Sequence, residues 1–327
     1  MKQFKSISVL LLRIAVSLLS LGLVFYSARG RFTEAMGYIT KINFWLLGIA
    51  LALNFVSIFP ISFRLCRILA IQNVSIPFFR CYYLWTVSLF FNLFLPSAVG
   101  GDVARAYYIY KDSGKKMAAA SSVLLDRFFG LIAAVSIGFT AFTVARNQIS
   151  DPRIGRFLSI FVGVVFVAVC FVMSRRVGKF VRKFLLTFSP KRFQEQLKKI
   201  FSALDLYGQR RLDFFIAYGY SLIAQGIFIF LVYVLARSIG IDLPISVFFL
   251  FMPIVAVVSL APSIGGLGVR EAATVYLFRK YISLDQAVAL SLVFDLFTYG
   301  IGALCGILYA IRGGASIREI EGIEKSV

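Results

Sequence analysis

Two short stretches of the chain carry almost the same set of chemically useful residues. Residues 96–105 have the sequence PSAVGGDVAR, and residues 262–271 have the sequence PSIGGLGVRE. Each combines a proline that stops a helix, a pair of glycines that permits tight turns, and an arginine. Backbone N–H groups at the start of a helix bind phosphate, and arginine strengthens such a site. The repeated stretch therefore predicts two phosphate-binding loops.

A second pattern accompanies the two loops. The pattern S-x-x-x-D-x-F occurs at residues 122–128 and again at 291–297, with Asp126 and Asp295 at its centre. The aspartates are 169 residues apart (295 − 126), close to the 166 residues between the loops (262 − 96). An ionised group inside a membrane span is costly and needs a partner. The candidate partners are Arg105, Arg127 and Arg270. Two interpretations stay open, a structural ion pair that clamps loop to span and a role in substrate binding or proton coupling.

The candidate substrate site combines the loop residues with these charged groups. Its members are Ser97, Gly100, Gly101, Asp102, Arg105, Asp126, Arg127, Ser263, Gly265, Gly266, Gly268, Arg270, Glu271 and Asp295. In it, Arg105 and Arg270 would bind a phosphate, and the neighbouring Asp102 and Glu271 would form salt bridges with them. The simpler alternative is that both loops are only hairpin tips, with arginines at the membrane interface. A matched pair of loops favours binding.

The composition predicts an all-α polytopic membrane protein. Hydrophobic residues make up 60% of the chain and charged residues 15%, and the mean hydropathy is +0.86. The net charge of +20 would suggest nucleic acid in a soluble protein, but in a membrane protein basic loops orient the chain and attract anionic lipid headgroups. The chain has no histidine, and its four cysteines are scattered singly. We therefore expect no metal site and no cofactor.

The apolar runs predict about six full spans and two re-entrant helical hairpins. The spans are expected at about residues 8–28, 44–63, 118–145, 157–173, 214–236 and 287–311, and the hairpins at 80–112 and 247–281. The arm after the first loop is too short to cross a hydrocarbon core of about 30 Å. Arg64 and Arg67 are interpreted as cytoplasmic charges that follow the second span.

The hairpins divide the chain into two half-repeats of opposite orientation. Residues 1–150 form the first half and residues 151–312 the second, followed by a tail at 313–327. The second half begins with a basic amphipathic segment at 175–211, which fixes the cytoplasmic side. Both termini are then cytoplasmic, and the protein is expected in the cell (inner or plasma) membrane.

Three motifs together resemble a known family. The runs FLPSAVGGDVAR, LLDRFFG and APSIGGLGVREAA are similar to the transmembrane domain of lysylphosphatidylglycerol synthases, also described as flippase-like membrane proteins. In bifunctional members, the resemblance implies a membrane domain that translocates a modified phospholipid and a soluble domain that attaches the amino acid. This chain leaves no room for the soluble domain, so we expect the membrane half alone and no synthase activity.

These observations favour a non-enzymatic lipid translocator. It would move an anionic phospholipid or a polyprenyl-phosphate lipid between leaflets, with the headgroup between the two hairpin tips. Two alternatives stay open, a non-catalytic membrane partner of a lipid synthase or glycosyltransferase and an intramembrane enzyme that acts on a lipid-linked substrate. The expected partner is a lipid with an anionic headgroup, and association with further copies or with a membrane enzyme stays open.

Overall fold

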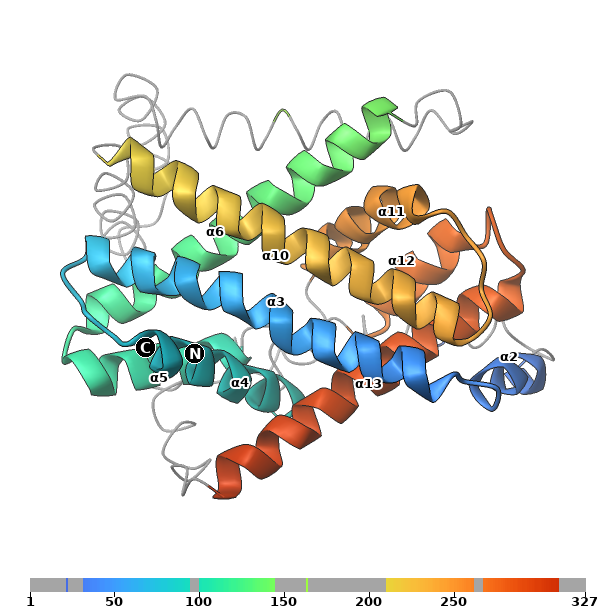
Figure 1. Cartoon of the computed structure of the whole chain (residues 1–327), viewed down its shortest axis with the longest axis horizontal. Coiled ribbons are helices and arrows are strands. Elements are labelled where there is room, and N and C mark those ends of the chain that lie inside the picture. Colours follow the sequence, from blue (N-terminus) through green and yellow to red (C-terminus); the bar gives the residue numbers. More distant parts are fainter. Residues whose placement is uncertain are drawn as a thin grey trace, which may run out of the picture. The chain divides into compact units, whose positions relative to one another are not determined.

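The structure is a computed structural model that describes residues 32–94, 100–144, 210–261 and 267–311, together with Gly22 and Gly163. Within these ranges the chain forms nine helices and no strand. The helices, in chain order (Figure 1), are α2 (Phe32–Ile39), α3 (Phe44–Ile71), α4 (Phe78–Phe94), α5 (Gly100–Ser113), α6 (Lys116–Val144), α10 (Arg211–Ser238), α11 (Ile245–Val258), α12 (Val269–Phe278) and α13 (Leu284–Ile311).

Four of these helices are long and apolar enough to cross a membrane. They are α3, α6, α10 and α13, with 28, 29, 28 and 28 residues. At 1.5 Å per residue each measures about 42 Å, which exceeds a hydrocarbon core of about 30 Å. They provide membrane-span candidates at four of the six predicted positions, while the spans predicted at 8–28 and 157–173 lie outside the described residues. The chain is a multi-pass membrane protein.

The short helices lie between the long ones in the same order in both halves of the chain. The helices α3, α4, α5 and α6 have 28, 17, 14 and 29 residues, and α10 to α13 have 28, 14, 10 and 28. The second short helix of each pair, at about 21 Å and about 15 Å, is too short for a crossing. The order agrees with two arms between two spans, but whether the arms re-enter the membrane stays a prediction.

The helices group into two compact units that interleave along the chain. Unit 1 contains Met1–Val56, Thr86–Ala104 and Gly226–Val327, and unit 2 contains Ser57–Trp85 and Arg105–Gln225. In unit 1, α12 packs against α11 and α13, and α13 also packs against α2. In unit 2, Phe63 of α3 stacks on Phe78 of α4, with ring centroids 4.2 Å apart. Since α3 and α10 contribute to both units, the units are not the predicted halves, which stay a hypothesis about topology.

Local capping explains where two long helices begin, and a turn precedes a third. The Asn43 side chain accepts hydrogen bonds from the backbone N–H groups of Trp45 and Leu46 and so caps α3. Ser283 and Gln286 exchange backbone and side-chain hydrogen bonds, which forms a capping box at α13. The Ser113 hydroxyl accepts from the Lys115 N–H just before α6.

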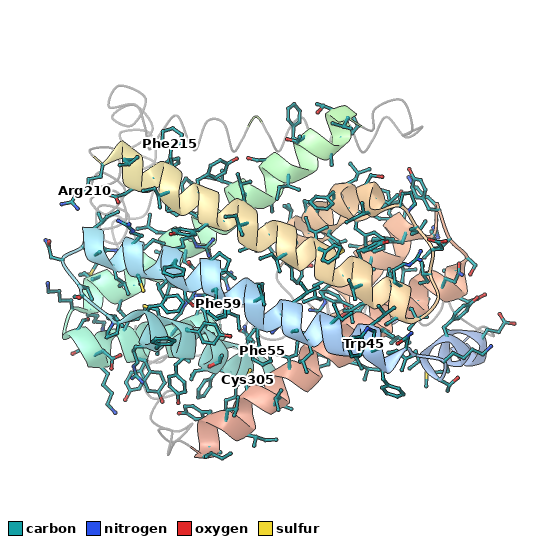
Figure 2. The ribbon with its side chains drawn as sticks, viewed as in Figure 1. Trp45, Phe55, Phe59, Arg210, Phe215 and Cys305 are labelled. Atoms are coloured by element: carbon teal, nitrogen blue, oxygen red, sulfur yellow. The ribbon has the colours of Figure 1, made fainter. Side chains whose placement is uncertain are left out.

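Aromatic side chains mark the exposed surface of the long helices. Trp45, in the first turn of α3 (Figure 2), exposes most of its side chain. An exposed tryptophan at the end of an apolar helix is typical of a membrane–water interface. Phe59 on the same helix and Phe215 near the start of α10 are also exposed (Figure 2), as expected for side chains that face lipid.

One boundary predicted from the sequence is wrong. The second span was expected to end near residue 63, with Arg64 as a charge in the cytoplasmic interface. In the structure α3 continues to Ile71, and Arg64 is buried. Hydropathy falls at the first charge, but the helix continues because backbone hydrogen bonding does not depend on side-chain polarity. Arg64 therefore belongs to the interior of unit 2.

Candidate functional site

A buried carboxylate on α6 holds the charged cluster of unit 2 together. Asp126 lies in the tenth position after the start of α6 and is 2% exposed. Its Oδ1 accepts a hydrogen bond of 2.8 Å from Nε of Arg64 and lies 2.7 Å from Nη2 of the same residue. Arg64 also donates from Nη1 to the hydroxyl of Ser221 on α10, at 2.8 Å. These contacts join α3, α6 and α10.

The second arginine of this cluster lies on α5, the helix that follows the first glycine-containing stretch. Arg105 of α5 has no exposed surface, and its Nη1 lies 3.1 Å from Oδ2 of Asp126. Its guanidinium also stacks over the ring of Trp85 on α4, 3.9 Å from the ring centroid. A desolvated cation over an indole ring adds to the stabilisation from the carboxylate. Arg105, a predicted phosphate ligand, is thus enclosed by its own helices.

Unit 1 contains a second cluster of the same type. Arg270 of α12 forms an ion pair with Asp295 of α13, through Nη2 and Oδ1. The same Nη2 lies 3.5 Å from Oε1 of the adjacent Glu271. The Arg270 guanidinium also lies over the Phe294 ring, 5.0 Å from its centroid. Of the three candidate partners, Arg105 contacts Asp126 and Arg270 contacts Asp295, and Glu271 contacts Arg270 as predicted.

The two clusters differ in charge balance. Arg64, Arg105 and Asp126 have a formal charge of +1 (two arginines, one carboxylate). Arg270, Glu271 and Asp295 have a formal charge of −1 (one arginine, two carboxylates). Sequence reasoning missed this difference because it treated Arg64 as an interfacial charge. The sequence did contain one indication: Arg64 lies inside a continuous stretch of 28 residues that are all compatible with a helix.

The glycines near the loops act through close packing and backbone conformation. Gly101 donates its N–H to Oδ1 of Asn92 at 2.8 Å and accepts from the Ser88 hydroxyl at 2.9 Å. A Cβ at Gly101 would overlap the Ser88 carbonyl oxygen, so only glycine lets α5 approach α4 this closely. Gly268 has φ of 81° where α12 begins, a conformation that favours glycine. The Gly101 N–H, expected to face a ligand, is occupied by Asn92 in this structure.

The other predicted site residues fall into two groups. Gly100 and Asp102 are buried in the first turn of α5, in unit 1, and Arg127 is half-buried on α6, in unit 2. The loop tips lie outside the described residues, and with them the predicted approach of one tip to the other. The site residues affected are Ser97, Ser263, Gly265 and Gly266.

An exposed ion pair in unit 2 provides a comparison for the buried ones. Arg80 donates from Nε to Asp112 Oδ2 at 2.7 Å and from Nη2 to Oδ1 at 3.0 Å. The hydrogen bonds to Asp112 raise the pKa of the Arg80 guanidinium. Both side chains are accessible to solvent, so this pair contributes little to stability compared with a buried one.

Across the described ranges, no group of three or more histidine, cysteine, aspartate or glutamate side chains could hold a metal ion.

The comparisons with known proteins identify the family. No curated protein matches the chain. Residues 10–306 match the family described as the lysylphosphatidylglycerol synthase TM region. The match includes both glycine-containing stretches and all six charged residues of the two clusters. The chain therefore belongs to the lysylphosphatidylglycerol synthase transmembrane-region family.

Proposed function

We propose that the protein is a lipid translocator that moves an anionic phospholipid or a polyprenyl-phosphate lipid between leaflets. The observation that carries the proposal is the repeated arrangement of charges. In each half of the chain, an arginine on a short helix after a glycine-containing loop pairs with an aspartate inside the next long apolar helix. Buried charges in membrane proteins mark substrate pathways, and paired broken segments mark the central site of transporters.

The aspartates would act as exchangeable counter-ions for the arginines. A buried guanidinium needs an anion at all times, because an unpaired charge in a low-dielectric interior is costly. Asp126 and Asp295 supply that anion in the structure, and a lipid phosphate would replace them with bidentate hydrogen bonds. Exchange of one anion for another keeps the desolvation cost low.

Exposure distinguishes the two arginines. The Arg270 side chain is 16% exposed, whereas that of Arg105 is fully enclosed. On this proposal the headgroup meets Arg270 in the conformation described here and reaches Arg105 after a rearrangement. This order of events corresponds to alternating access, in which two half-repeats of opposite orientation rock against each other. The proposal places the protein in the inner or plasma membrane, with both termini in the cytoplasm and no catalytic step.

Leaflet exchange in liposomes tests the proposal. The purified protein is reconstituted with a fluorescent anionic phospholipid, and a membrane-impermeant quencher reports the probe in the outer leaflet. We expect exchange well above that of protein-free liposomes, and Arg105→Gln should slow it at least tenfold. This variant leaves Arg64 paired with Asp126, so the Asp126 carboxylate keeps a cation. Arg80→Gln, which breaks an exposed ion pair in the same unit, serves as the matched control and should exchange at the wild-type rate.

Two results would contradict the proposal. One is exchange no faster than in empty liposomes, and the other is an Arg105→Gln protein as fast as the control. Mass spectrometry of the lipids after exchange should recover them chemically unchanged. A new lipid product would instead support the intramembrane enzyme.

A further inference from the structure

The cluster of unit 1 contains one more carboxylate than its arginine can neutralise. Glu271 is 3% exposed and lies in the first turn of α12, and Asp295 faces it from α13. Both carboxyl groups contact the same nitrogen, Nη2 of Arg270, so they lie close to one another. Two neighbouring carboxyl groups repel each other when both are ionised, and they can form a hydrogen bond with each other only if one of them is protonated.

One oxygen of this cluster has no partner. Oε2 of Glu271 is buried and accepts no hydrogen bond from the described part of the chain. Nε of Arg270 is likewise buried and without an acceptor there. A buried carboxylate oxygen without a donor is strongly unfavourable, and a bound proton removes its charge.

In the described part of unit 1, only Arg270 contacts the two carboxyl groups as a cation. On α12 and α13 the neighbouring ionisable groups are Arg270 and Tyr299. The helix α11 and residues 86–94 of α4 contain no ionisable side chain. The other described cations of unit 1 have different neighbours: Arg237 pairs with Asp242, Arg279 and Lys280 lie over the Tyr276 ring, and Lys41 is exposed. The further acidic groups and tyrosines of unit 1, such as Asp102, Asp285 and Tyr233, add no positive charge. With both carboxylates ionised, the trio therefore keeps its excess negative charge.

We propose that Glu271 and Asp295 together bind one exchangeable proton beside Arg270. Uptake of the proton makes the three groups electrically neutral, and its release leaves one uncompensated negative charge in a buried site. Burial favours the neutral form, and the proton belongs to the pair rather than to either residue. The inference deepens the proposed function: if the protein translocates lipid, it names a proton as the coupling ion.

The geometry favours a proton over a metal cation. A metal ion at the two carboxylates would lie directly beside the Arg270 guanidinium, which repels it. Hard cations such as sodium or calcium take about six or more oxygen ligands, whereas this site offers four carboxylate oxygens, two of which contact Arg270. A proton needs only one carboxyl oxygen.

The cluster of unit 2 gives the opposite expectation. Asp126 contacts two arginines, so these three groups carry an excess of positive rather than negative charge. Although the two aspartates occupy matching places in the sequence pattern, the excess of carboxyl groups that the proton site requires is found in the cluster of unit 1.

Infrared difference spectroscopy tests the proton site without any transport. The purified protein in lipid nanodiscs is taken from about pH 5, where ordinary carboxyl groups are already largely ionised, to about pH 9. We expect the carbonyl band of a buried protonated carboxyl group to disappear as the pH rises. The frequency of this band should shift when the water is replaced by deuterated water. Glu271→Gln and Asp295→Asn should each abolish this band. Asp242→Asn, at an exposed aspartate of the same unit, should retain it.

In Glu271→Gln and in Asp295→Asn, Arg270 retains one carboxylate, so each variant keeps a neutral ion pair. The folding of both variants can be verified by circular dichroism and by size-exclusion chromatography. Absence of the band in the wild-type protein, or its persistence in folded Glu271→Gln and Asp295→Asn proteins, overturns the inference.

Liposomes then separate this inference from the proposed function. In the wild-type protein an imposed pH gradient should change leaflet exchange at least threefold, and in Glu271→Gln it should not. If the infrared band is present but no leaflet exchange occurs, translocation is refuted and the proton site is still supported. Leaflet exchange without a band would refute the proton site alone.

Discussion

Arg64 and Arg105 share one carboxylate, whereas Arg270 is shared by two. Removal of an aspartate therefore has opposite electrostatic consequences in the two units. Without Asp126, the buried guanidinium groups of Arg64 and Arg105 lose the carboxylate that both of them contact. Without Asp295, Arg270 keeps Glu271, and the remaining pair is neutral. Matching positions in a repeated sequence pattern need not contribute equally to stability.

We expect Asp126→Asn to destabilise the protein by about 3–5 kcal/mol, the usual cost of removing one partner of a buried ion pair. Asp295→Asn should cost less than about 1 kcal/mol, because one balanced pair replaces an unbalanced trio. Thermal unfolding in detergent, followed with a thiol-reactive dye, measures both. Cys81 is buried in unit 2 and Cys305 in unit 1, so each unit carries its own reporter.

The exposed aspartates provide controls for this comparison. Asp112→Asn in unit 2 and Asp242→Asn in unit 1 remove surface ion pairs and should each change stability by less than about 1 kcal/mol. Equal losses for Asp126→Asn and Asp295→Asn, or a larger loss for Asp295→Asn, would contradict the charge balance inferred for the clusters.

At the residue scale, the sequence predicts part of each cluster. Arg105, Asp126, Arg270 and Asp295 could be found because a repeated pattern makes each pair stand out from its apolar surroundings. Arg64 could not, because a single arginine near the end of an apolar run looks the same whether it lies in the interface or is buried. Which it is depends on helix packing, which brings Arg64 to Asp126 across 62 positions of sequence.

At the element scale, two glycines on α13 let a second helix approach closely. Gly302 and Gly306 form the pattern G-x-x-x-G, typical of tightly packed membrane helices. In unit 1, a Cβ at Gly302 would lie 2.6 Å from Cδ1 of Leu93 and 3.1 Å from the Leu89 carbonyl oxygen. A Cβ at Gly306 would overlap the ring of Phe90. The face of α13 that follows Asp295 therefore packs against α4.

We predict that Gly302→Ala destabilises the protein by about 1–3 kcal/mol, the usual cost of overpacking. Gly300→Ala, two residues earlier on the same helix, is the matched control because no atom lies within 4 Å of a Cβ there. It should be neutral or stabilise by up to about 1 kcal/mol through helix propensity. Thermal unfolding reported by Cys305 distinguishes them, and equal behaviour of the two variants would contradict the close approach of α4.

The boundaries of the described helices could largely be predicted from the sequence. Hydropathy placed α6, α10 and α13 within a few positions, and the hairpins expected at 80–112 and 247–281 begin within two positions of α4 and α11. The close approaches at Gly101 and Gly302 could not be predicted, because a glycine that permits a turn and one that admits a neighbouring helix have the same residue type. Only the neighbour decides between them, such as Ser88 or Leu93.

At the scale of the whole molecule, the central hypothesis is that the two half-repeats have opposite orientation. The order of long, short, short and long helices recurs, but an order of lengths is the same for parallel and inverted repeats. Opposite orientation requires that the connection between α5 and α6 lie in the cytoplasm and the connection between α12 and α13 outside. Lys116 and Lys280 lie in these two connections or at their edges, and both are exposed.

Single-cysteine labelling therefore tests the topology. The four native cysteines are replaced, and Lys116→Cys and Lys280→Cys are made separately. In sealed right-side-out vesicles, a membrane-impermeant maleimide should label Lys280→Cys at once and Lys116→Cys only after the vesicles are opened. This result is expected because both connections are polar and each short helix is too short for a full crossing. Labelling of both cysteines from the same side would show that the repeats are parallel. Alternating access by two inverted halves would then be excluded, whereas the charge clusters within each unit would be unaffected.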